Sequence, residues 1–243
     1  MKDIFASSRP QLAVLIDPDH QGSAAYEQLL IELQLWPVDI ILVGGSTSHK
    51  NNIDAVCQEL KANSNAPVFL FPGNHFQLSK YADGVLTLSL LSGRNPDFLI
   101  GRMVEAAPII KSYQLEYLPT GYIIIGDHTN SATSYITQTR PIPSHHVNIA
   151  VQTALAGQFL GMQALYLEAG SGAQQPISLD MITRIQEAVE IPIIVGGGIQ
   201  NASQIETYIR ANVDTIVIGT ALEQNPKLLQ SFHLSIQENQ LHE

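Results

Sequence analysis

Residues 191–219 read IPIIVGGGIQNASQIETYIRANVDTIVIG, and this stretch decides the fold. It begins with an apolar run, passes through three glycines into a segment with helical spacing, and ends in a second apolar run. Ser203 and Glu206 form a capping-box pattern that predicts a helix start before Ile209. Continuous apolar runs of this length are typical of strands buried on both faces of a parallel sheet. The stretch therefore predicts one strand–helix–strand unit.

The same unit recurs along the chain. Six further apolar runs precede it, namely LAVLID (12–17), VDIILVGG (38–45), PVFLF (67–71), GVLTLS (84–89), GYIIIG (121–126) and ALYLEAG (164–170). Helical spacing lies between most of them, as in Ala24–Leu35, which Pro37 ends, and after Asn95-Pro96, a cap followed by a first helical residue. Eight strands alternating with helices predict an α/β fold, a single (β/α)8 barrel of the TIM type over residues 1–243.

The interval between the third and fourth runs departs from this pattern. Residues 72–83 include Pro72, Gly73 and Asn74, which favour turns. The interval is too short for a loop, a full helix and a second loop. We therefore expect the third helix of the barrel to be reduced or replaced by a loop.

Composition excludes several classes of protein. Hydrophobic residues make up 45% of the chain and charged residues 14%, which suits a globular domain with a large core. The net charge of −10 argues against binding of a nucleic-acid backbone. We expect no transmembrane segment, because no run of about 18 apolar residues is present. The single cysteine, Cys57, excludes an internal disulfide and fits a cytoplasmic location, and its helical stripe with Val56 and Leu60 predicts a core position.

The functional residues of such barrels lie where strands end. Six of the 17 glycines (170, 172, 196, 197, 198 and 219) fall in the loops after the last three strands. Glycine lets backbone N–H groups approach an anion closely, and a following helix start adds a favourable dipole. Glycines also permit tight turns, but three consecutive loops favour a phosphate site. Backbone amides would let an acidic protein bind an anion without a cluster of lysines.

Two carboxylates stand at the ends of strands. Asp17 begins an Asp-Pro-Asp sequence (17–19), which is either a turn former or the site of a hard divalent cation such as Mg²⁺, with Ser46 supplying a further oxygen. Glu168 precedes a glycine loop, where it either takes or orients a proton of a ligand hydroxyl or pairs with a buried N–H. The sequence leaves both alternatives open.

Together these motifs resemble the geranylgeranylglyceryl phosphate synthases and the related bacterial heptaprenylglyceryl phosphate synthases. The resemblance rests on LIDPDH (15–20), VGGS (43–46), SLLSGRNPDFLIG (89–101), PTGYIII (119–125), GMQALYLEAGSGA (161–173), IPIIVGGGI (191–199) and VIGTA (217–221). The motifs occur in this order over nearly the whole chain, and YLEAGSGA is the most specific of them.

The resemblance implies a Mg²⁺-dependent prenyltransferase that joins a prenyl group, geranylgeranyl, from its diphosphate to the C3 hydroxyl of sn-glycerol 1-phosphate. It implies Asp17 and Ser46 as magnesium ligands, Asp17 and Glu168 as catalytic residues, and a homo-oligomer. The glycerol phosphate site that it implies consists of Tyr166, Leu167, Glu168, Ala169, Gly170, Ser171, Gly172, Gly197, Gly198, Gly219 and Thr220. A prenyl groove is implied beside residues 72–83, with Phe69, Phe71, Phe76, Leu86 and Leu88 as apolar candidates for its lining.

The chain departs from this family at two positions. Members commonly carry Lys where this chain has His20, and a basic residue where it has Gln200. A neutral His contributes less charge than Lys to a phosphate site near pH 7. Two other functions stay open, an isomerase or lyase of a phosphorylated metabolite and a non-catalytic barrel that binds a phosphorylated ligand. The presence of both Asp17 and Glu168 favours an enzyme.

Overall fold

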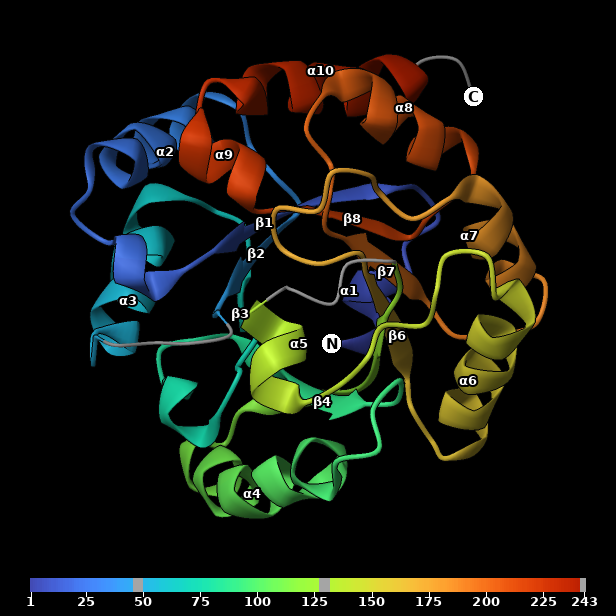
Figure 1. Cartoon of the computed structure of the whole chain (residues 1–243). Helices are drawn as coiled ribbons and strands as arrows, with labels where there is room; N and C mark the ends of the chain where they lie inside the picture. The colour runs from blue at the N-terminus through green and yellow to red at the C-terminus, as the bar shows by residue number, and fades with distance from the viewer. Residues whose placement is uncertain (46–49, 127–131, 241–243) are drawn as a thin grey trace.

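The computed structural model describes residues 1–45, 50–126 and 132–240, and within them eight parallel strands close into a barrel (Figure 1). The strands are β1 (Gln11–Ile16), β2 (Ile40–Val43), β3 (Val68–Leu70), β4 (Gly84–Leu90), β5 (Glu116–Ile124), β6 (Ala164–Glu168), β7 (Ile193–Gly196) and β8 (Thr215–Ile218). They pair in chain order, and β1 also pairs with β8, where Gln11 lies opposite Thr215. The predicted (β/α)8 fold is confirmed.

Helices surround the strands (Figure 1). The α-helices are α1 (Lys2–Phe5), α2 (Ala24–Leu35), α3 (Ile53–Asn63), α4 (Arg102–Tyr113), α5 (Ala132–Thr137), α6 (Val147–Phe159), α7 (Leu179–Gln186), α8 (Ala202–Arg210), α9 (Thr220–Gln224) and α10 (Leu228–Gln240). Shorter turns are η1 (Pro18–His20), η2 (His75–Gln77) and the π-helical η3 (Asp97–Gly101). Between β3 and β4, where every residue is described, the chain forms only the short η2, so the expected reduction of the third helix is confirmed.

Helix α2 illustrates how local sequence sets these elements. The Ser23 hydroxyl accepts a hydrogen bond from the Tyr26 N–H and so caps the first turn. Apolar residues on one face of the helix, among them Leu33, are buried against the barrel. The helix ends before Pro37, as the sequence predicts.

The fifth strand is longer than the sequence predicts, because β5 begins at Glu116 instead of Gly121. Glu116 and Tyr117 are exposed, and Pro119 interrupts the apolar run. Proline has no N–H to donate and is unusual inside a central strand. The continuous apolar run that is typical of a strand buried on both faces therefore begins only after Pro119, so the sequence places the start of β5 too late.

Two helix starts also differ from the predicted ones. The capping box of α8 is formed by Asn201 and Gln204, two residues before the predicted pair, because the helix begins at Ala202. The Asn95 side chain accepts a hydrogen bond from the Asp97 N–H, as a cap does, but the chain first forms η3 before it enters α4. Both helices exist where the sequence predicts them, and only their first turns differ.

The hydrophobic core has two parts, one in the layer between strands and helices and one inside the barrel. Cys57 lies in the layer between strands and helices and is 0% exposed, which confirms its predicted core position. Inside the barrel, the ring of Phe5 packs 5.5 Å from that of Phe69, measured between centroids. The Met1 amine pairs with Glu116 at the start of β5, so α1 lies at the end where the strands begin. This end is closed, which leaves the opposite end for a cavity.

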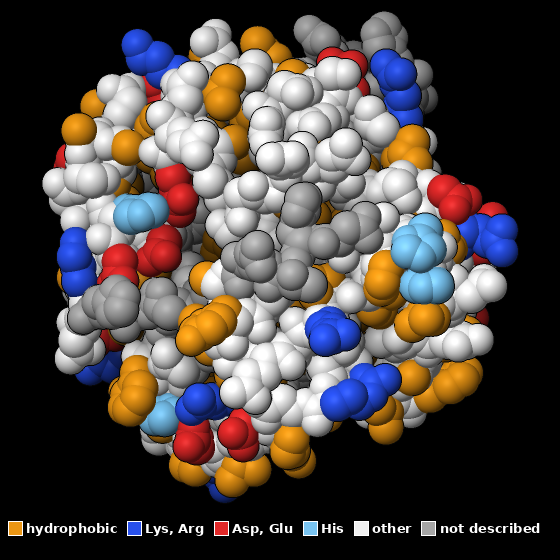
Figure 2. Space-filling model, viewed as in Figure 1, with side chains coloured by type: hydrophobic (Ala, Val, Ile, Leu, Met, Phe, Trp, Pro, Cys, Tyr) orange, Lys and Arg blue, Asp and Glu red, His pale blue; other side chains and the backbone are white. Residues whose placement is uncertain are grey.

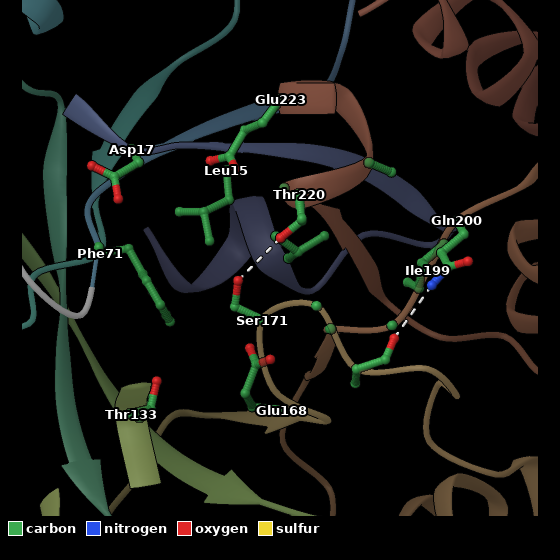
Figure 3. Close-up of a pocket in the computed structure, with 18 of the residues that line it drawn as sticks. Leu15, Asp17, Phe71, Thr133, Glu168, Ser171, Ile199, Gln200, Thr220 and Glu223 are labelled. Carbon is green, nitrogen blue, oxygen red and sulfur yellow. Dashed lines mark hydrogen bonds between the residues drawn. The ribbon is translucent and has the colours of Figure 1, made fainter. Parts of the chain in front are cut away.

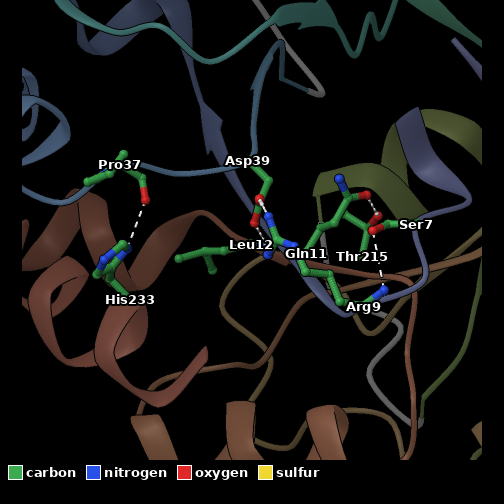
Figure 4. A network of polar contacts seen from close by, with 8 residues as sticks. All are labelled: Ser7, Arg9, Gln11, Leu12, Pro37, Asp39, Thr215 and His233. Atoms are coloured by element: carbon green, nitrogen blue, oxygen red, sulfur yellow. Dashed lines mark hydrogen bonds and ion pairs between the residues drawn. The ribbon is translucent and has the colours of Figure 1, made fainter. Parts of the chain in front are cut away.

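Polar contacts stabilise the same end (Figure 4). The Arg9 guanidinium pairs with Asp39, whose second carboxylate oxygen accepts a hydrogen bond of 2.9 Å from the Leu12 N–H. His233 of α10 places Nδ1 2.8 Å from the Pro37 carbonyl oxygen. Residues at this end of such barrels commonly serve stability rather than chemistry.

A substitution at Gly44, directly after β2, tests how closely the strands pack. A Cβ at Gly44 would lie 1.9 Å from the Phe71 carbonyl oxygen, a backbone atom fixed by β3. We expect Gly44→Ala to lower the free energy of unfolding by about 3 kcal/mol, the upper range for overpacking, measured by urea denaturation. Gly101→Ala is the matched control, because a Cβ there meets nothing closer than 3.3 Å, and it should change stability by less than about 1 kcal/mol. Equal losses in both variants would contradict this expectation.

Candidate active site

A cavity of about 500 Å³ opens at the end of the barrel where the strands finish, which we call the mouth of the barrel (Figure 3). The residues singled out from the sequence that line it are Asp17, Phe71, Tyr166, Glu168, Ser171, Gly172, Gly197, Gly198, Gln200, Gly219 and Thr220. They come together because the carboxyl ends of parallel strands meet at one end of a closed barrel. Leu167 instead faces the outer side of β6 and is 0% exposed, and neither Ala169 nor Gly170 is among the lining residues.

The glycine loops present backbone to this cavity. Gly197 and Gly198 have φ of 83° and 72°, a region that L side chains rarely adopt. A Cβ at Gly198 would also lie 2.7 Å from the Gln175 carbonyl oxygen. The hydroxyls of Ser171 and Thr220 lie 3.0 Å apart and connect the loops after β6 and β8 (Figure 3). A concave surface of backbone and hydroxyl groups of this kind suits an anion.

Glu168 ends β6 with only 7% of its surface exposed. Its Oε1 accepts a short hydrogen bond of 2.6 Å from the Gly170 N–H. Burial raises the pKa of Glu168 to about 7, although hydrogen bonds from Gly170, Tyr166 and Tyr122 oppose the rise. Burial also raises the pKa of both tyrosines well above 10, so their hydroxyls stay protonated and can donate. A carboxyl group with a pKa near 7 can take a proton at neutral pH.

Asp17 lies on the wall of the cavity after β1. Its Oδ1 accepts a hydrogen bond of 2.9 Å from the Asp19 N–H, which makes Asp17 the cap of η1. A Cβ on Gly45 would lie 2.6 Å from Asp17 Oδ2, so glycine at this position leaves room for the carboxylate. Ser46, the other predicted magnesium ligand, lies outside the described residues.

Glu223 of α9 faces the cavity near Asp17 (Figure 3). Its Oε1 lies 3.3 Å from His20 Nδ1. Figure 2 shows acidic side chains close to a histidine on one side of this face of the molecule. Burial raises the pKa of Glu223, His20 opposes the rise, and the charge of Asp17 adds to it. His20, which stands where family members commonly carry Lys, therefore lies in contact with the carboxylate of Glu223.

The wall around Asp17 suits a hard divalent cation. The carboxylates of Asp17 and Glu223 face the same cavity, and carboxylate oxygens are ligands that Mg²⁺ prefers. Among the described residues, no group of three or more His, Cys, Asp and Glu side chains could enclose a metal. A cation here would need water or substrate oxygens in its shell, as is usual for Mg²⁺.

A second, smaller cavity of about 90 Å³ adjoins the first. Gly45, Phe71, Tyr122 and Thr133 line both cavities. The remaining lining residues are Pro72, Gly73, Leu88, Leu90, Phe98, Arg102, Ile136 and Thr137. This cavity is mainly apolar and lies beside the segment that replaces the third helix.

The five apolar candidates for a prenyl groove fall into three groups. Phe71 and Leu88 line the smaller cavity. Phe69 and Leu86 are buried inside the barrel and belong to its core. Phe76 is 76% exposed and is not among the lining residues. The first four share the inward strand phase, and their depth in the barrel decides which of them line the cavity. Phe76 lies in η2, where neither strand nor helix spacing applies.

Sequence reasoning missed several residues of the larger cavity, among them Tyr122, Thr133 and Glu223. Tyr122 lies in a predicted strand, and the alternation of inward-facing and outward-facing residues along that strand could have identified it. Thr133 and Glu223 lie in the short helices α5 and α9, away from the strand ends at which functional residues are expected. No pattern in the sequence distinguishes them.

A closed barrel in which glycine loops and a buried, proton-accepting carboxylate share one cavity defines an anion-binding enzyme of the (β/α)8 class. The chain belongs to the PcrB family, whose model matches residues 7–236. This confirms the resemblance that the sequence motifs indicate.

Curated relatives and solved structures agree with this family. Geranylgeranylglyceryl phosphate synthase of Spirosoma linguale is 44% identical over 238 residues, which cover 98% of this chain and 96% of the relative. The protein of that name from Pyrococcus furiosus is 42% identical over 211 residues, with 86% and 83% covered. A crystal structure of (S)-3-O-geranylgeranylglyceryl phosphate synthase from Thermoplasma acidophilum, in complex with its substrate sn-glycerol-1-phosphate, has a TM-score of 0.88 at 28% identity and covers 95% of this chain and 94% of that one.

The raised pKa of Glu168 predicts a pH-dependent effect on stability. The carboxyl of Glu168 binds its proton more tightly in the folded protein, so folding loses stability as the pH rises from about 4.5 through 7. Gln cannot ionise, so the gain in unfolding free energy from Glu168→Gln should increase by roughly 2 to 3 kcal/mol between pH 5 and pH 8. Urea denaturation of both proteins at each pH measures this difference. A difference that does not vary with pH would show that the carboxyl is not destabilised by burial.

Proposed function

We propose that this chain transfers a prenyl group from a prenyl diphosphate to the C3 hydroxyl of sn-glycerol 1-phosphate. In this reaction the bond between the prenyl carbon and the diphosphate oxygen breaks, an ether bond to the C3 oxygen forms, pyrophosphate leaves and the hydroxyl gives up its proton. The proposal rests chiefly on one observation: the buried carboxylate of Glu168 shares a cavity with the glycine loops, and the apolar cavity adjoins it. The curated relatives carry the name of this activity.

We assign the phosphate of glycerol 1-phosphate to the loops after β6, β7 and β8. The hydroxyls of Ser171 and Thr220 and the backbone around Gly172, Gly197 and Gly219 supply donors there. Donors of this kind are already oriented and uncharged, so they bind an anion without a cluster of cationic side chains.

Glu168 orients the C3 hydroxyl and accepts its proton during ether formation. The Gly170 N–H fixes Oε1 at 2.6 Å, and the side chain lines the cavity that the acceptor would enter. A base with a pKa of about 7 is half deprotonated at neutral pH, which suits general base catalysis. The hydroxyls of Tyr122 and Tyr166 orient the carboxylate further.

Asp17 is the residue of the described chain that would hold Mg²⁺, and Ser46 is the second ligand that we propose. When bound, Mg²⁺ neutralises negative charge on the departing pyrophosphate. Asp17 contributes a carboxylate that the Asp19 N–H orients at the cavity wall. The diphosphate would then lie opposite the glycine loops, which keeps the two phosphorylated groups apart.

The prenyl chain of the donor, geranylgeranyl by analogy with the named relatives, is assigned to the apolar cavity. Phe71, Leu88 and Phe98 line it, and each buried methylene contributes about 0.8 kcal/mol to binding. The missing helix after β3 leaves the outer side of this cavity thinly covered. A long chain can therefore extend past the barrel wall.

The remaining proposals concern the state of the whole molecule. Among the described residues, no helix is long and apolar enough to cross a membrane. We propose a homo-oligomer located in the cytoplasm. Exposed apolar side chains support the oligomer, since Val104 of α4 is 66% exposed and Phe159 of α6 is 80% exposed.

Asp17→Asn tests the proposed metal site. The substitution removes the negative charge of a ligand at the cavity wall and leaves core packing unchanged, so turnover should fall by at least about 100-fold while the protein stays folded. Calorimetry should show glycerol 1-phosphate binding within about twofold of the wild type. Full activity at limiting Mg²⁺ would remove Asp17 from the metal site.

Glu168→Gln tests the catalytic base. The variant should lose about 100-fold or more in kcat, and free prenyl alcohol should rise relative to the ether product, because water can still capture the prenyl group. The wild-type kcat/KM should rise with pH up to about 7 and then level off, since the base must be deprotonated. Product ratios measured by chromatography and a pH profile check both points. Ether formation at the wild-type rate by the folded variant would exclude Glu168 as the base.

A further inference from the structure

On the exposed side of the turn that carries Asp17, Lys50 Nζ donates to the Asp19 carbonyl oxygen at 2.7 Å. On its other side the turn is supported by four further side chains that do not face either cavity at the mouth. They are Gln21 at the end of the turn, Tyr26 of α2, Asn52 before α3 and Glu59 of α3. Helices α2 and α3 lie side by side (Figure 1), so this group fills the space between them and η1.

Three hydrogen bonds join these side chains into one network, and a fourth connects the network to the backbone of the turn. Asn52 Nδ2 donates to the Pro18 carbonyl oxygen at 2.7 Å and to Gln21 Oε1 at 2.9 Å. Gln21 Nε2 in turn donates to Glu59 Oε2 at 3.0 Å, and that oxygen also accepts the Tyr26 hydroxyl at 2.8 Å. The bonds therefore fix both ends of the turn, at Pro18 and at Gln21, and anchor them to a carboxylate on α3.

Asn52 stands at the N-cap of α3 but makes no capping hydrogen bond. Asparagine at this position ordinarily accepts a bond from the first turn of its own helix and stabilises it by about 1 kcal/mol. Here the amide donates to the turn, and its Oδ1 is buried with no hydrogen-bond partner among the described residues. The side chain of Asn52 therefore supports η1 rather than α3.

We propose that Asn52 and Gln21 are positioning residues that hold the Pro18–Gln21 turn so that Asp17 keeps its carboxylate directed at the divalent cation. This inference rests on the metal role proposed for Asp17. The Asp17 side chain is bound to the Asp19 N–H within the same turn, so a shift of the turn moves the carboxylate. Residues that orient a metal ligand in this way commonly raise metal affinity by 10- to 100-fold.

A purely structural role would be to cross-link α2 with α3. The chain offers a matched control for that role, because Gln34 Nε2 of α2 donates to Asn63 Oδ1 of α3 at 2.7 Å. This bond connects the same two helices, and neither side chain contacts the turn. Loss of the Gln34 bond should affect stability alone.

The experiment compares Asn52→Leu and Gln21→Met with Gln34→Met and Asp17→Asn. Each of the first three is close in size to the native side chain and cannot make its hydrogen bonds. Mn²⁺ alone serves as the probe, and its binding is measured by electron paramagnetic resonance. We expect the Kd for Mn²⁺ to rise about 10-fold in Asn52→Leu and Gln21→Met, to stay within twofold in Gln34→Met, and to be lost in Asp17→Asn.

Kinetics provide a second readout. Excess Mg²⁺ should restore kcat in Asn52→Leu but not in Asp17→Asn, and the KM for glycerol 1-phosphate should be unchanged. If Asn52→Leu does not fold, Gln21→Met decides the question.

Wild-type Mn²⁺ affinity in the folded positioning variants, together with loss in Asp17→Asn, would overturn the inference and leave the proposed function intact. Wild-type Mn²⁺ affinity in Asp17→Asn would overturn it as well, since no cation would then depend on the turn. Absence of prenyl transfer by the wild type would refute the proposed function, and the Mn²⁺ titration would still test the inference.

Discussion

The hydrogen bond of 2.6 Å from the Gly170 N–H to Glu168 Oε1 is the contact on which the geometry of the mouth depends. A buried carboxylate is unfavourable unless donors surround it, so the loop after β6 folds back over the end of its own strand. This return requires a φ of 104° at Gly170. It also leaves no space for a side chain at Gly197, where a Cβ would lie 2.4 Å from the same oxygen. The need for glycine at positions 170 and 197 thus follows from one buried carboxylate.

Around this contact, the mouth separates two electrostatic environments. The loops after β6 to β8 present backbone and hydroxyl groups, whereas β1 and α9 contribute Asp17 and Glu223. A chain with a net charge of −10 repels anions at long range, so local donors and a cation must compensate for that field. Under the proposed function, this division would give the phosphate of glycerol 1-phosphate and a metal-bound diphosphate separate places. Glu168 lies within reach of both because the closed barrel brings β1 and β6 to the same opening.

Much of this arrangement could be predicted from the sequence. Strands buried on both faces, the interval without a helix and the glycine loops each have a local pattern, which is why the barrel could be predicted and why most residues assigned to the glycerol phosphate site line one cavity. The start of β5 was missed because Pro119 and exposed residues break that pattern. Glu223 and Thr133 depend on where the short helices α9 and α5 pack, which is a tertiary property. The same holds for Phe76, whose exposure follows from η2 and not from its hydrophobicity.

The pairing of β1 with β8, in which Gln11 lies opposite Thr215, has a consequence for how the protein folds. Contacts between residues so distant in the chain form slowly, because a long loop must close first. The first strand therefore keeps an unpaired edge until the last one is available. The contact of His20 with Glu223 crosses this seam, and that of Ser171 with Thr220 also depends on β8 being in place. The chemical site is thus incomplete until β8 has paired with β1, and a nascent chain that lacks β8 lacks Thr220 and Glu223 of the cavity.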